Sequence, residues 1–341
     1  MRLSVALLLL LLAAGAGLGW CLHWLKKPLP LAEAGLSIEL KPGDSLVRVA
    51  HRLRSEGVLH HPQILVAYGR LTGATGIKVG EYKVAPGTSP RSLLEQLVRG
   101  DVVSYQVTLV EGWTYAQALA ALHAESRLTA QLADLSVERQ LEVLDMDVDH
   151  PEGWFFPDTY RFTRGMSDVD ILRQAHRRMR DLLEREWAAR APGLPYANAY
   201  EALIMASIVE RETGQPAERR QIAGVFVRRL QNNMRLQTDP TIIYGLGSDF
   251  DGNIRRRHLR QATPYNTYVI RGLPPTPIAL PGREAIYATL HPDDSEALYF
   301  VAKGDGSHQF SNTLEEHNKA VRRYQIVRRK KDYRSAPQPK N

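Results

Sequence analysis

The sequence predicts an α+β protein that has a single transmembrane helix at its amino end and two folded domains after it. Three observations support this prediction: an uncharged apolar run over residues 3–25, a strand–turn–helix pattern that recurs between residues 37 and 122, and longer amphipathic helices after residue 168. The chain has 341 residues, of which 44% are hydrophobic and 24% charged. This composition excludes wholesale disorder, and the length allows two hydrophobic cores.

The apolar run at the amino end predicts one membrane crossing. It contains no acid, Lys or Arg from Leu3 to Leu25. A helix of this length measures about 34 Å, which suffices for the hydrocarbon core of a bilayer. Cleavage as a signal peptide near Ala14–Ala16 is the alternative, but the run continues well past these small residues, which favours an uncleaved anchor over residues 1–28. The flanking charges do not decide the orientation.

Residues 29–107 predict a small α+β domain with a weak internal repeat. Each unit is a short strand, a turn that contains Gly, a capping Ser, Thr or Asp, and a short amphipathic helix. The strands are expected at 37–40, 81–84 and 105–110, and the third unit continues into the next domain. The first turn and helix start, Lys41–Leu46, resemble a LysM module, which binds the glycan of peptidoglycan or chitin. Generic turn chemistry is the alternative explanation of the same residues.

The basic excess lies at the carboxyl end. The chain has a formal charge of +7, and residues 321–341 hold eight basic residues against one acid, Asp332, so the remainder is neutral. A basic groove is therefore not predicted, and no nucleic-acid partner is expected. The tail is interpreted as a solvated end, with contact to a polyanion as the alternative. The single cysteine, Cys21, excludes an intramolecular disulfide and a zinc cluster built on thiolates.

Residues 108–320 predict a second domain that mixes helices with short strands. Helices are expected over 169–187, 198–213, 219–230 and 314–327, with a further helix from residue 285 and a strand over 298–302. Asn198 is expected to cap the second of these helices, with Glu201 three residues on. The aromatic segment Glu152–Tyr160 is either a packed loop or one wall of a sugar cleft.

An acid on the apolar side of a predicted helix is the candidate catalytic residue. At about 100° per residue, Glu212 falls in the middle of the apolar face of the helix over 198–213, whereas Glu210 falls almost opposite and is interpreted as a solvated acid. Burial and the carboxyl end of the helix both disfavour the charge on Glu212, which raises its pKa toward that of a general acid. The alternative is a structural role, for example as a partner of Arg219.

The helix that carries Glu212 includes the first of several blocks that share a resemblance. These blocks are Ala206–Thr213, Glu152–Thr159, Met234–Thr241, Tyr244–Gly245, Thr263–Tyr268, Gly272–Pro275, Tyr299–Ala302, Gly304, Gly306, His308, Phe310 and Glu316–Asn318. Together they resemble the YceG-like family of endolytic murein transglycosylases (MltG). The resemblance extends over essentially the whole chain, anchor included.

The resemblance implies a bacterial inner-membrane protein that crosses the membrane once, with its carboxyl-terminal bulk in the periplasm. Such an enzyme cuts the β-1,4 bond between N-acetylmuramic acid and N-acetylglucosamine in nascent peptidoglycan. It leaves 1,6-anhydromuramic ends and so terminates the elongation of glycan strands. The partners implied are peptidoglycan glycan strands, the inner membrane and peptidoglycan synthases, and no cofactor is implied.

The family's catalytic acid is the Glu that precedes Thr, which corresponds here to Glu212. This carboxyl group would first protonate the glycosidic oxygen and then take the proton of the muramic acid 6-hydroxyl, so that one carboxylate serves both steps. Ordinary glycosidases need two carboxylates. Asp239 is the nearest second candidate, and a turn or a helix start is its alternative role.

Substrate contacts are predicted from the matching blocks, because Tyr, Asn and Gln offer flat faces or paired donors and acceptors to sugars. The predicted contacts are Gln237, Asp239, Tyr244, Asn266 and Tyr268. Each is equally compatible with ordinary buried hydrogen bonding.

Two other functions compete with the transglycosylase. One is a catalytically inactive, membrane-anchored peptidoglycan-binding protein, against which the intact Glu–Thr motif argues. The other is a hydrolase that leaves reducing ends, against which the lack of a clear second carboxylate argues. His291, His308 and His317 are spread too widely for a local metal signature, so no metal site is predicted.

Overall fold

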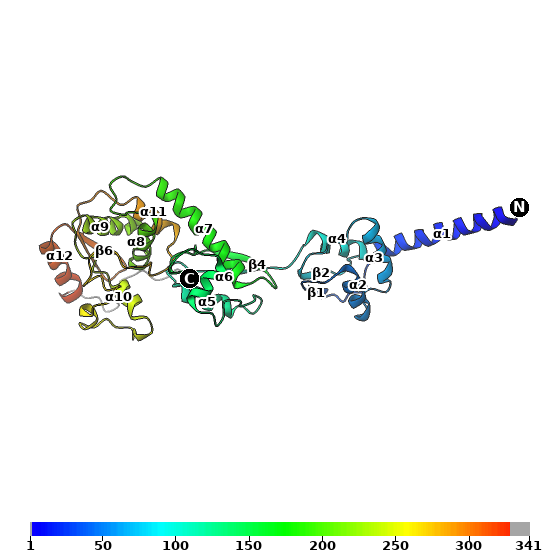
Figure 1. Cartoon of the computed structure of the whole chain (residues 1–341), viewed down its shortest axis with the longest axis horizontal. Coiled ribbons are helices and arrows are strands. Elements are labelled where there is room, and N and C mark those ends of the chain that lie inside the picture. The colour runs from blue at the N-terminus through cyan, green and yellow to red at the C-terminus, as the bar shows by residue number, and fades with distance from the viewer. Residues whose placement is uncertain (1, 328–341) are drawn as a thin grey trace. The chain divides into compact units, whose positions relative to one another are not determined.

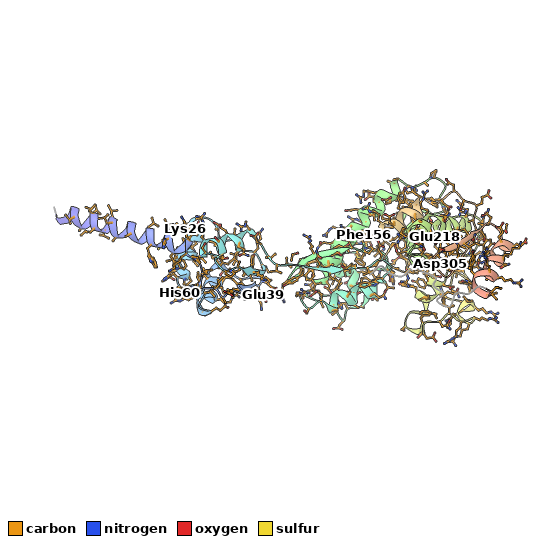
Figure 2. The ribbon with its side chains drawn as sticks, turned by 180° about the vertical axis from the view of Figure 1, so that it is seen from behind. Lys26, Glu39, His60, Phe156, Glu218 and Asp305 are labelled. Carbon is orange, nitrogen blue, oxygen red and sulfur yellow. The ribbon has the colours of Figure 1, made fainter. Side chains whose placement is uncertain are left out.

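The computed structural model describes residues 2–327 and confirms the α+β class, with helices and three two-stranded sheets among these residues (Figure 1). The chain divides into two compact units. Unit 1 comprises Met1–Gln106 and Arg161–Met166, and unit 2 comprises Val107–Tyr160 and Ser167–Asn341. In Figure 2, the labels Lys26 and His60 lie on unit 1, and the labels Phe156 and Glu218 lie on unit 2.

The helix α1 (Arg2–Lys26) forms the amino end of unit 1. Its portion Val5–Lys26 is the one helix of the described residues that is long and apolar enough to cross a membrane. The end of α1 packs into the folded part of unit 1, because Leu25 and Leu29 are 3% and 6% exposed and belong to its hydrophobic core. No flexible linker therefore separates the apolar helix from the core of unit 1.

The rest of unit 1 is built around an antiparallel pair of strands. Its elements are β1 (Leu36–Leu40), α2 (Leu46–Ser55), α3 (Pro62–Leu71), β2 (Gly80–Val84) and α4 (Pro90–Arg99). In the pairing of β1 with β2, Leu36 lies opposite Val84 and Leu40 opposite Gly80. The sequence pattern missed α3, because this helix lacks the glycine turn and the side-chain cap that mark the neighbouring units.

The predicted turns and caps of the repeat are confirmed. Gly43 and Gly87 have φ angles of 86° and 84°, a region that residues with a Cβ rarely adopt. Ser45 and Ser89 each accept a hydrogen bond from the backbone N–H three residues later, which caps α2 and α4. The third unit follows the same plan, with Thr114 capping α5. The repeat therefore predicted local structure correctly.

Four short elements, separated by loops, lie between α4 and the long helices in the sequence. They are β3 (Ser104–Thr108), α5 (Tyr115–Ala124), α6 (Val137–Leu144) and β4 (Thr159–Thr163). The strand β3 pairs with β4, so the end of the aromatic segment that begins at Glu152 turns into a strand. The sequence did not predict β4.

Unit 2 packs its helices around α8. The elements are α7 (Asp168–Ala188), α8 (Ala199–Glu212), η1 (Pro216–Glu218), α9 (Arg219–Gln231), α10 (Asp239–Leu246), η2 (Gly247–Asp249), η3 (His258–Arg260), α11 (Arg283–Leu290), β5 (Tyr299–Ala302), β6 (His308–Ser311), α12 (Leu314–Val321) and a last π-helical segment, Arg322–Val327. The helices predicted over 169–187, 198–213 and 219–230 are confirmed within two residues. The helix expected over 314–327 is instead α12 followed by the π-helical segment. Of the predicted basic tail, residues 328–341 lie outside the described residues.

The helix α8 is buried on all sides along most of its length. Asn198 accepts a hydrogen bond from the N–H of Glu201, as predicted, and every residue from Ala202 to Val209 is at most 4% exposed. Because this stretch is buried on every side, the acids that follow it at the end of α8 adjoin the core of unit 2. This placement decides the surroundings of Glu210 and Glu212.

Candidate active site

Glu212 is the last residue of α8, and the chain leaves the helix in an extended conformation at Thr213. The hydroxyl of Thr238 donates a hydrogen bond to Oε1 of Glu212. Burial raises the pKa of Glu212 to about 7, and the negative charge of Asp239 adds to this rise, whereas the hydrogen bond from Thr238 and the charge of Arg229 oppose it. At neutral pH both protonation states of Glu212 are populated, which suits a group that gives and then takes a proton.

Thr238 is held in place by a second threonine. Its backbone N–H donates to Oγ1 of Thr267 at 3.1 Å, and Oγ1 of Thr267 lies 2.9 Å from the hydroxyl of Thr241. All three threonines are at most 1% exposed. Thr238 is also the N-cap residue of α10, yet its side chain makes no cap bond. Its hydroxyl donates to Glu212 and does not cap α10.

Asp239 and Tyr268 lie beside this acid. Asp239 is the first residue of α10, as the sequence suggested, and its side chain is exposed. The hydroxyl of Tyr268 donates to Oδ1 of Asp239 at 2.8 Å. Asp239 directly follows Thr238, whose hydroxyl bonds to Glu212, so both carboxyl groups belong to one site. Three of the residues predicted from the sequence are thus brought together.

Gln237 adopts a backbone conformation that is rare for a residue with a side chain. Its φ is 52°, and its backbone N–H donates to the carbonyl of Thr267 at 3.1 Å. Gln237 is exposed, while its neighbours Leu236 and Thr238 are 0% and 1% exposed. The chain therefore turns Gln237 outward next to the threonine that bonds to Glu212.

A model of the YceG-like family matches residues 38–323 of this sequence, a range that includes Glu212 and the residues around it. The chain belongs to the YceG-like family. It is 32% identical over 307 residues to the endolytic murein transglycosylase of Bacillus subtilis (strain 168), which covers 85% of this chain and 84% of that protein. It is 26% identical over 362 residues to the endolytic murein transglycosylase of Streptococcus pneumoniae, with 94% of this chain and 64% of that protein covered.

A solved structure is similar to this YceG-like chain in fold. The crystal structure of a yceG-like protein from Listeria monocytogenes matches with a TM-score of 0.50 and 28% sequence identity. The match covers 84% of this chain and 99% of that protein.

Two of the predicted contact residues lie in other surroundings of the YceG-like fold. The hydroxyl of Tyr244 donates to Oε2 of Glu152 at 3.1 Å. Asn266 is 1% exposed, and its amide donates to the carbonyls of His258 and Gln261 while its Oδ1 accepts from the N–H of Tyr268. Asn266 thereby fixes the backbone that presents Tyr268. Sugar contacts by these residues stay a prediction.

The interpretation of Glu210 as a solvated acid is wrong. The side chain of Glu210 is 6% exposed, accepts a hydrogen bond from the N–H of Gly282 at 2.9 Å and lies 3.5 Å from the guanidinium of Arg219. Burial raises the pKa of Glu210. Helical phase misjudged this residue, because Arg219 and the backbone at Gly282 cover the side of α8 on which it lies. Arg219, a suggested partner of Glu212, pairs with Glu210 instead.

Sequence reasoning missed a further buried carboxyl group, Glu152. It is 3% exposed, and its two oxygens accept hydrogen bonds from the N–H of Tyr115 at 2.8 Å and from the hydroxyl of Tyr244. Burial raises the pKa of Glu152 to about 7. Since both oxygens are engaged and the residue is almost fully covered, Glu152 holds the fold together around Tyr244 rather than facing a substrate. No periodic pattern surrounds Glu152 that would have marked it.

Sequence reasoning also missed Arg229, although a signal was present. Arg229 lies three, four and seven residues after Phe226, Val225 and Ile222, which places it on the buried face of α9, and it is 7% exposed. A charged residue on an apolar helix face is the same signal that drew attention to Glu212. Its side chain reaches the loop that precedes Thr238.

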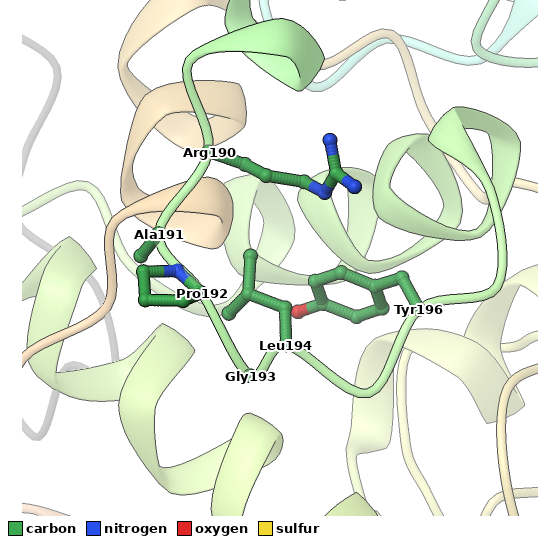
Figure 3. A pocket seen from close by; sticks show the side chains of 6 residues that line it. All are labelled: Arg190, Ala191, Pro192, Gly193, Leu194 and Tyr196. Atoms are coloured by element: carbon green, nitrogen blue, oxygen red, sulfur yellow. The ribbon is translucent and has the colours of Figure 1, made fainter.

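Two hollows lie elsewhere on unit 2. The first, of about 350 Å³, is formed by the loop between α7 and α8, and Figure 3 shows Leu194 and Tyr196 among the side chains that line it. The second, of about 490 Å³, lies along β6 and α12. None of the residues that line them is among the predicted site residues, so neither hollow changes the placement of the candidate site.

Proposed function

We propose that this chain is an endolytic murein transglycosylase in which Glu212 acts alone as general acid and then as general base. At the level of the enzyme class, the prediction from the sequence is confirmed by the family match and by relatives with that name, and nothing found favours a catalytically inactive binding protein. The choice of the acid depends on one observation. Glu212 ends a buried helix, receives a hydrogen bond from Thr238, and has a pKa of about 7.

In the first step, protonated Glu212 gives its proton to the oxygen of the β-1,4 bond between N-acetylmuramic acid and N-acetylglucosamine. The bond from this oxygen to the anomeric carbon breaks, and its electron pair stays on the departing hydroxyl of N-acetylglucosamine. Glu212 is left as a carboxylate. The pKa of about 7 makes the proton available without a strongly acidic medium.

In the second step, the carboxylate of Glu212 takes the proton of the muramic acid 6-hydroxyl. The hydroxyl oxygen closes on the anomeric carbon, which yields a 1,6-anhydro end without consuming water. Glu212 is again protonated, so that the cycle is complete. The same carboxyl group serves both steps because the two oxygens of the sugar lie near the same carbon.

The surroundings of the other acids support a single catalytic carboxylate. Glu152 is covered by protein and engaged on both oxygens, and Glu210 is paired with Arg219. Asp239 is exposed beside Glu212 and bonds to Tyr268. We therefore assign Asp239, Tyr268 and Gln237 to substrate contacts around Glu212, whereas sugar contacts by Tyr244 and Asn266 stay a prediction.

The remaining expectations concern location and partners. We propose that α1 crosses the bacterial inner membrane and that residues 29–107 form a LysM-like glycan-binding domain ahead of a catalytic domain over residues 108–320. Peptidoglycan outside the membrane then requires a periplasmic position for everything after α1. We further propose that the enzyme terminates strands as synthases extend them. This topology is tested with a reporter that is active only in the cytoplasm, fused to the carboxyl end of the chain. Activity of this fusion would contradict the topology.

The test of the proposed function is a digest of purified peptidoglycan by the full chain in detergent, followed by mass spectrometry of the products. Glu212→Gln is compared with Glu201→Gln, a matched control on the same helix whose side-chain oxygen can still accept the N–H of Ala197. We expect 1,6-anhydromuramic ends from the wild type and from Glu201→Gln, and none from Glu212→Gln.

Each other outcome points to a different function. Reducing ends would indicate a hydrolase, because water rather than the 6-hydroxyl would then attack the anomeric carbon. Cleavage that persists in Glu212→Gln would move the acid elsewhere. A wild-type chain that binds peptidoglycan and does not cut it would support the binding protein.

A further inference from the structure

Arg229 is a buried positive charge that one short loop links to the candidate acid, because Nη1 of Arg229 donates to the carbonyl of Leu236 and the hydroxyl of Thr238, two residues on, donates to Glu212. It lies near the end of α9 and is 7% exposed. Glu212 is the carboxyl group whose charge acts on the guanidinium, and the guanidinium in turn opposes the rise in the pKa of Glu212. The two groups therefore influence each other although no hydrogen bond joins them among the described residues.

The donors of Arg229 go to oxygens of neutral groups. Nε donates to the carbonyl of Leu298 at 2.7 Å, and Nη1 donates to the carbonyl of Leu236 at 2.7 Å and lies 3.5 Å from Oε1 of Gln237. The guanidinium also faces the ring of Tyr299 at 5.1 Å. Within residues 2–327, no carboxylate is within ion-pair distance of it. A buried cation with only neutral partners is costly, and this cost calls for a functional reason.

We propose that Arg229 stabilises the carboxylate that Glu212 becomes when it has protonated the glycosidic oxygen, and that the same guanidinium positions the loop from Leu236 to Thr238 against this acid. The proposal rests on the proposed function. Arg229 does not touch the substrate and is therefore a positioning residue.

The timing of charge in the reaction explains why a cation would be useful there. Before the first step Glu212 is neutral, and the guanidinium has no ionic partner. As the proton passes to the glycosidic oxygen, a negative charge develops on Glu212 and meets the fixed positive charge of Arg229. A preorganised charge aimed at the place where charge develops lowers the barrier without reorganisation. When the 6-hydroxyl gives its proton to the carboxylate, Glu212 is neutral again and Arg229 keeps its positive charge.

The other ionisable groups around this pair have defined effects. Asp239 from α10 raises the pKa of Glu212 and so acts against Arg229. Burial raises the pKa of the Tyr268 hydroxyl, which is therefore neutral near pH 7. His317 of α12 stacks on Tyr299, and burial lowers the pKa of its imidazole. Arg229 is thus the cation that favours the charged form of Glu212.

The test is the pH dependence of kcat/KM for peptidoglycan cleavage by the full chain in detergent, which reports the pKa values of the free enzyme. Activity needs protonated Glu212, so the rate falls as the pH rises through its pKa. Removal of the cation raises this pKa. The alkaline limb is the part of the pH profile in which kcat/KM falls as the pH rises. For Arg229→Gln, which can still donate to the carbonyl of Leu236, we expect this limb to move to higher pH by about one unit and kcat to fall about tenfold.

Arg229→Lys separates the charge from the hydrogen bonds. Lys keeps the positive charge but lacks the planar fork of donors. We expect its alkaline limb to stay within a few tenths of a unit of the wild type, even where kcat falls. If Gln and Lys lower kcat alike and leave the limb in place, Arg229 has a structural role only and the proposal is overturned.

Arg228 is the matched control. It is the preceding residue of the same helix, and it also holds a loop, through the carbonyl of Ala297 at 2.8 Å and the side chain of Asp293. Arg228→Gln is expected to lower thermal stability and to leave the alkaline limb unchanged. A limb that moves as far in Arg228→Gln as in Arg229→Gln contradicts a specific effect of Arg229.

The failure of this inference can be told apart from the failure of the proposed function. Reducing ends from the wild type would contradict the transglycosylase chemistry, yet the limb would still test Arg229, because the inference needs only an acid at Glu212. If Glu212→Gln still cleaves peptidoglycan at the wild-type rate, Glu212 is not the acid, and both proposals are contradicted. If the alkaline limb of Arg229→Gln lies at the same pH as that of the wild type, only this inference is contradicted.

Discussion

Unit 1 and the centre of unit 2 are built by different rules. In unit 1, α2 and α4 bury one face each, and the other face is exposed. In unit 2, α8 buries every residue from Ala202 to Val209. A helix with a solvated side can place its charges there, whereas the charges at the end of α8 must be satisfied by neighbours. In this chain, regular amphipathic patterns therefore indicate the helices of the scaffold, whereas a charged residue on an apolar helix face indicates the candidate site.

The strongest test of this comparison is Glu212→Gln, followed by activity and by stability. We expect cleavage to fall by about a thousandfold or more, because the proton donor is lost. The pKa of Glu212 is raised to about 7 from its ordinary 4.5, so the folded state holds the proton more tightly than the unfolded chain does. The free energy of unfolding of the wild type thus falls as the pH rises from about 4.5 through 7.

Glu212→Gln removes this pH dependence. Thermal unfolding at pH 5 and at pH 8 should show that the stability of the variant, relative to that of the wild type, is greater at pH 8 than at pH 5. A variant that is less stable by the same amount at both values would mean that Glu212 is an ordinary structural residue.

The next largest effect is expected in unit 1, where the core includes the end of α1. A chain that begins at Pro30 lacks Leu25 and Leu29, which are 3% and 6% exposed. Against a chain that begins at Leu22, it should lose roughly 3 kcal/mol or more in the unfolding of unit 1, from two buried leucines. Denaturant unfolding measures the difference. Equal midpoints for the two chains would show that α1 is only a tether.

Two helix caps sharpen the comparison further. Thr238 caps α10 by position only, and its hydroxyl is bonded to Glu212. Thr238→Val removes this donor and keeps the shape of the side chain. Because the hydrogen bond lowers the pKa of Glu212, we expect the alkaline limb of the pH profile to move upward and cleavage to fall about tenfold. An unshifted profile would assign Thr238 to the helix rather than to the acid.

Ser89 is the corresponding cap in unit 1, and it bonds to the N–H of Ser92. Ser89→Ala should cost about 1 kcal/mol of stability, and the pH profile of cleavage should keep its shape. Thermal unfolding and the pH profile are measured on the same samples. A change of the profile in Ser89→Ala would mean that the two caps do not differ in the way proposed here.

The sequence predicted unit 1 well where its structure is local. Gly43 and Gly87 mark turns, and Ser45 and Ser89 mark caps, because each of these residues acts on its own neighbours. It failed at α3, whose start carries no side-chain cap, and at β4, whose pairing with β3 depends on a strand far away in the chain.

The candidate site could be predicted only in part. Glu212 was predicted from helical phase and from the resemblance, but the same phase argument misplaced Glu210, because Arg219 and the backbone at Gly282 cover that side chain. Arg229 was within reach of the same argument on α9. Glu152 was not, since its burial depends on Tyr115 and Tyr244, which are distant in sequence and brought together only by the fold.

The packing of α1 into unit 1 has a consequence for biosynthesis. Leu25 and Leu29 are made early, whereas Leu93 and Leu97, which belong to the same core, are made much later. Until α4 has been synthesised, the last turn of α1 has apolar side chains without their final partners. The core of unit 1 is therefore completed only after α4 has been made. If α1 crosses the membrane as we propose, its insertion precedes the completion of this core.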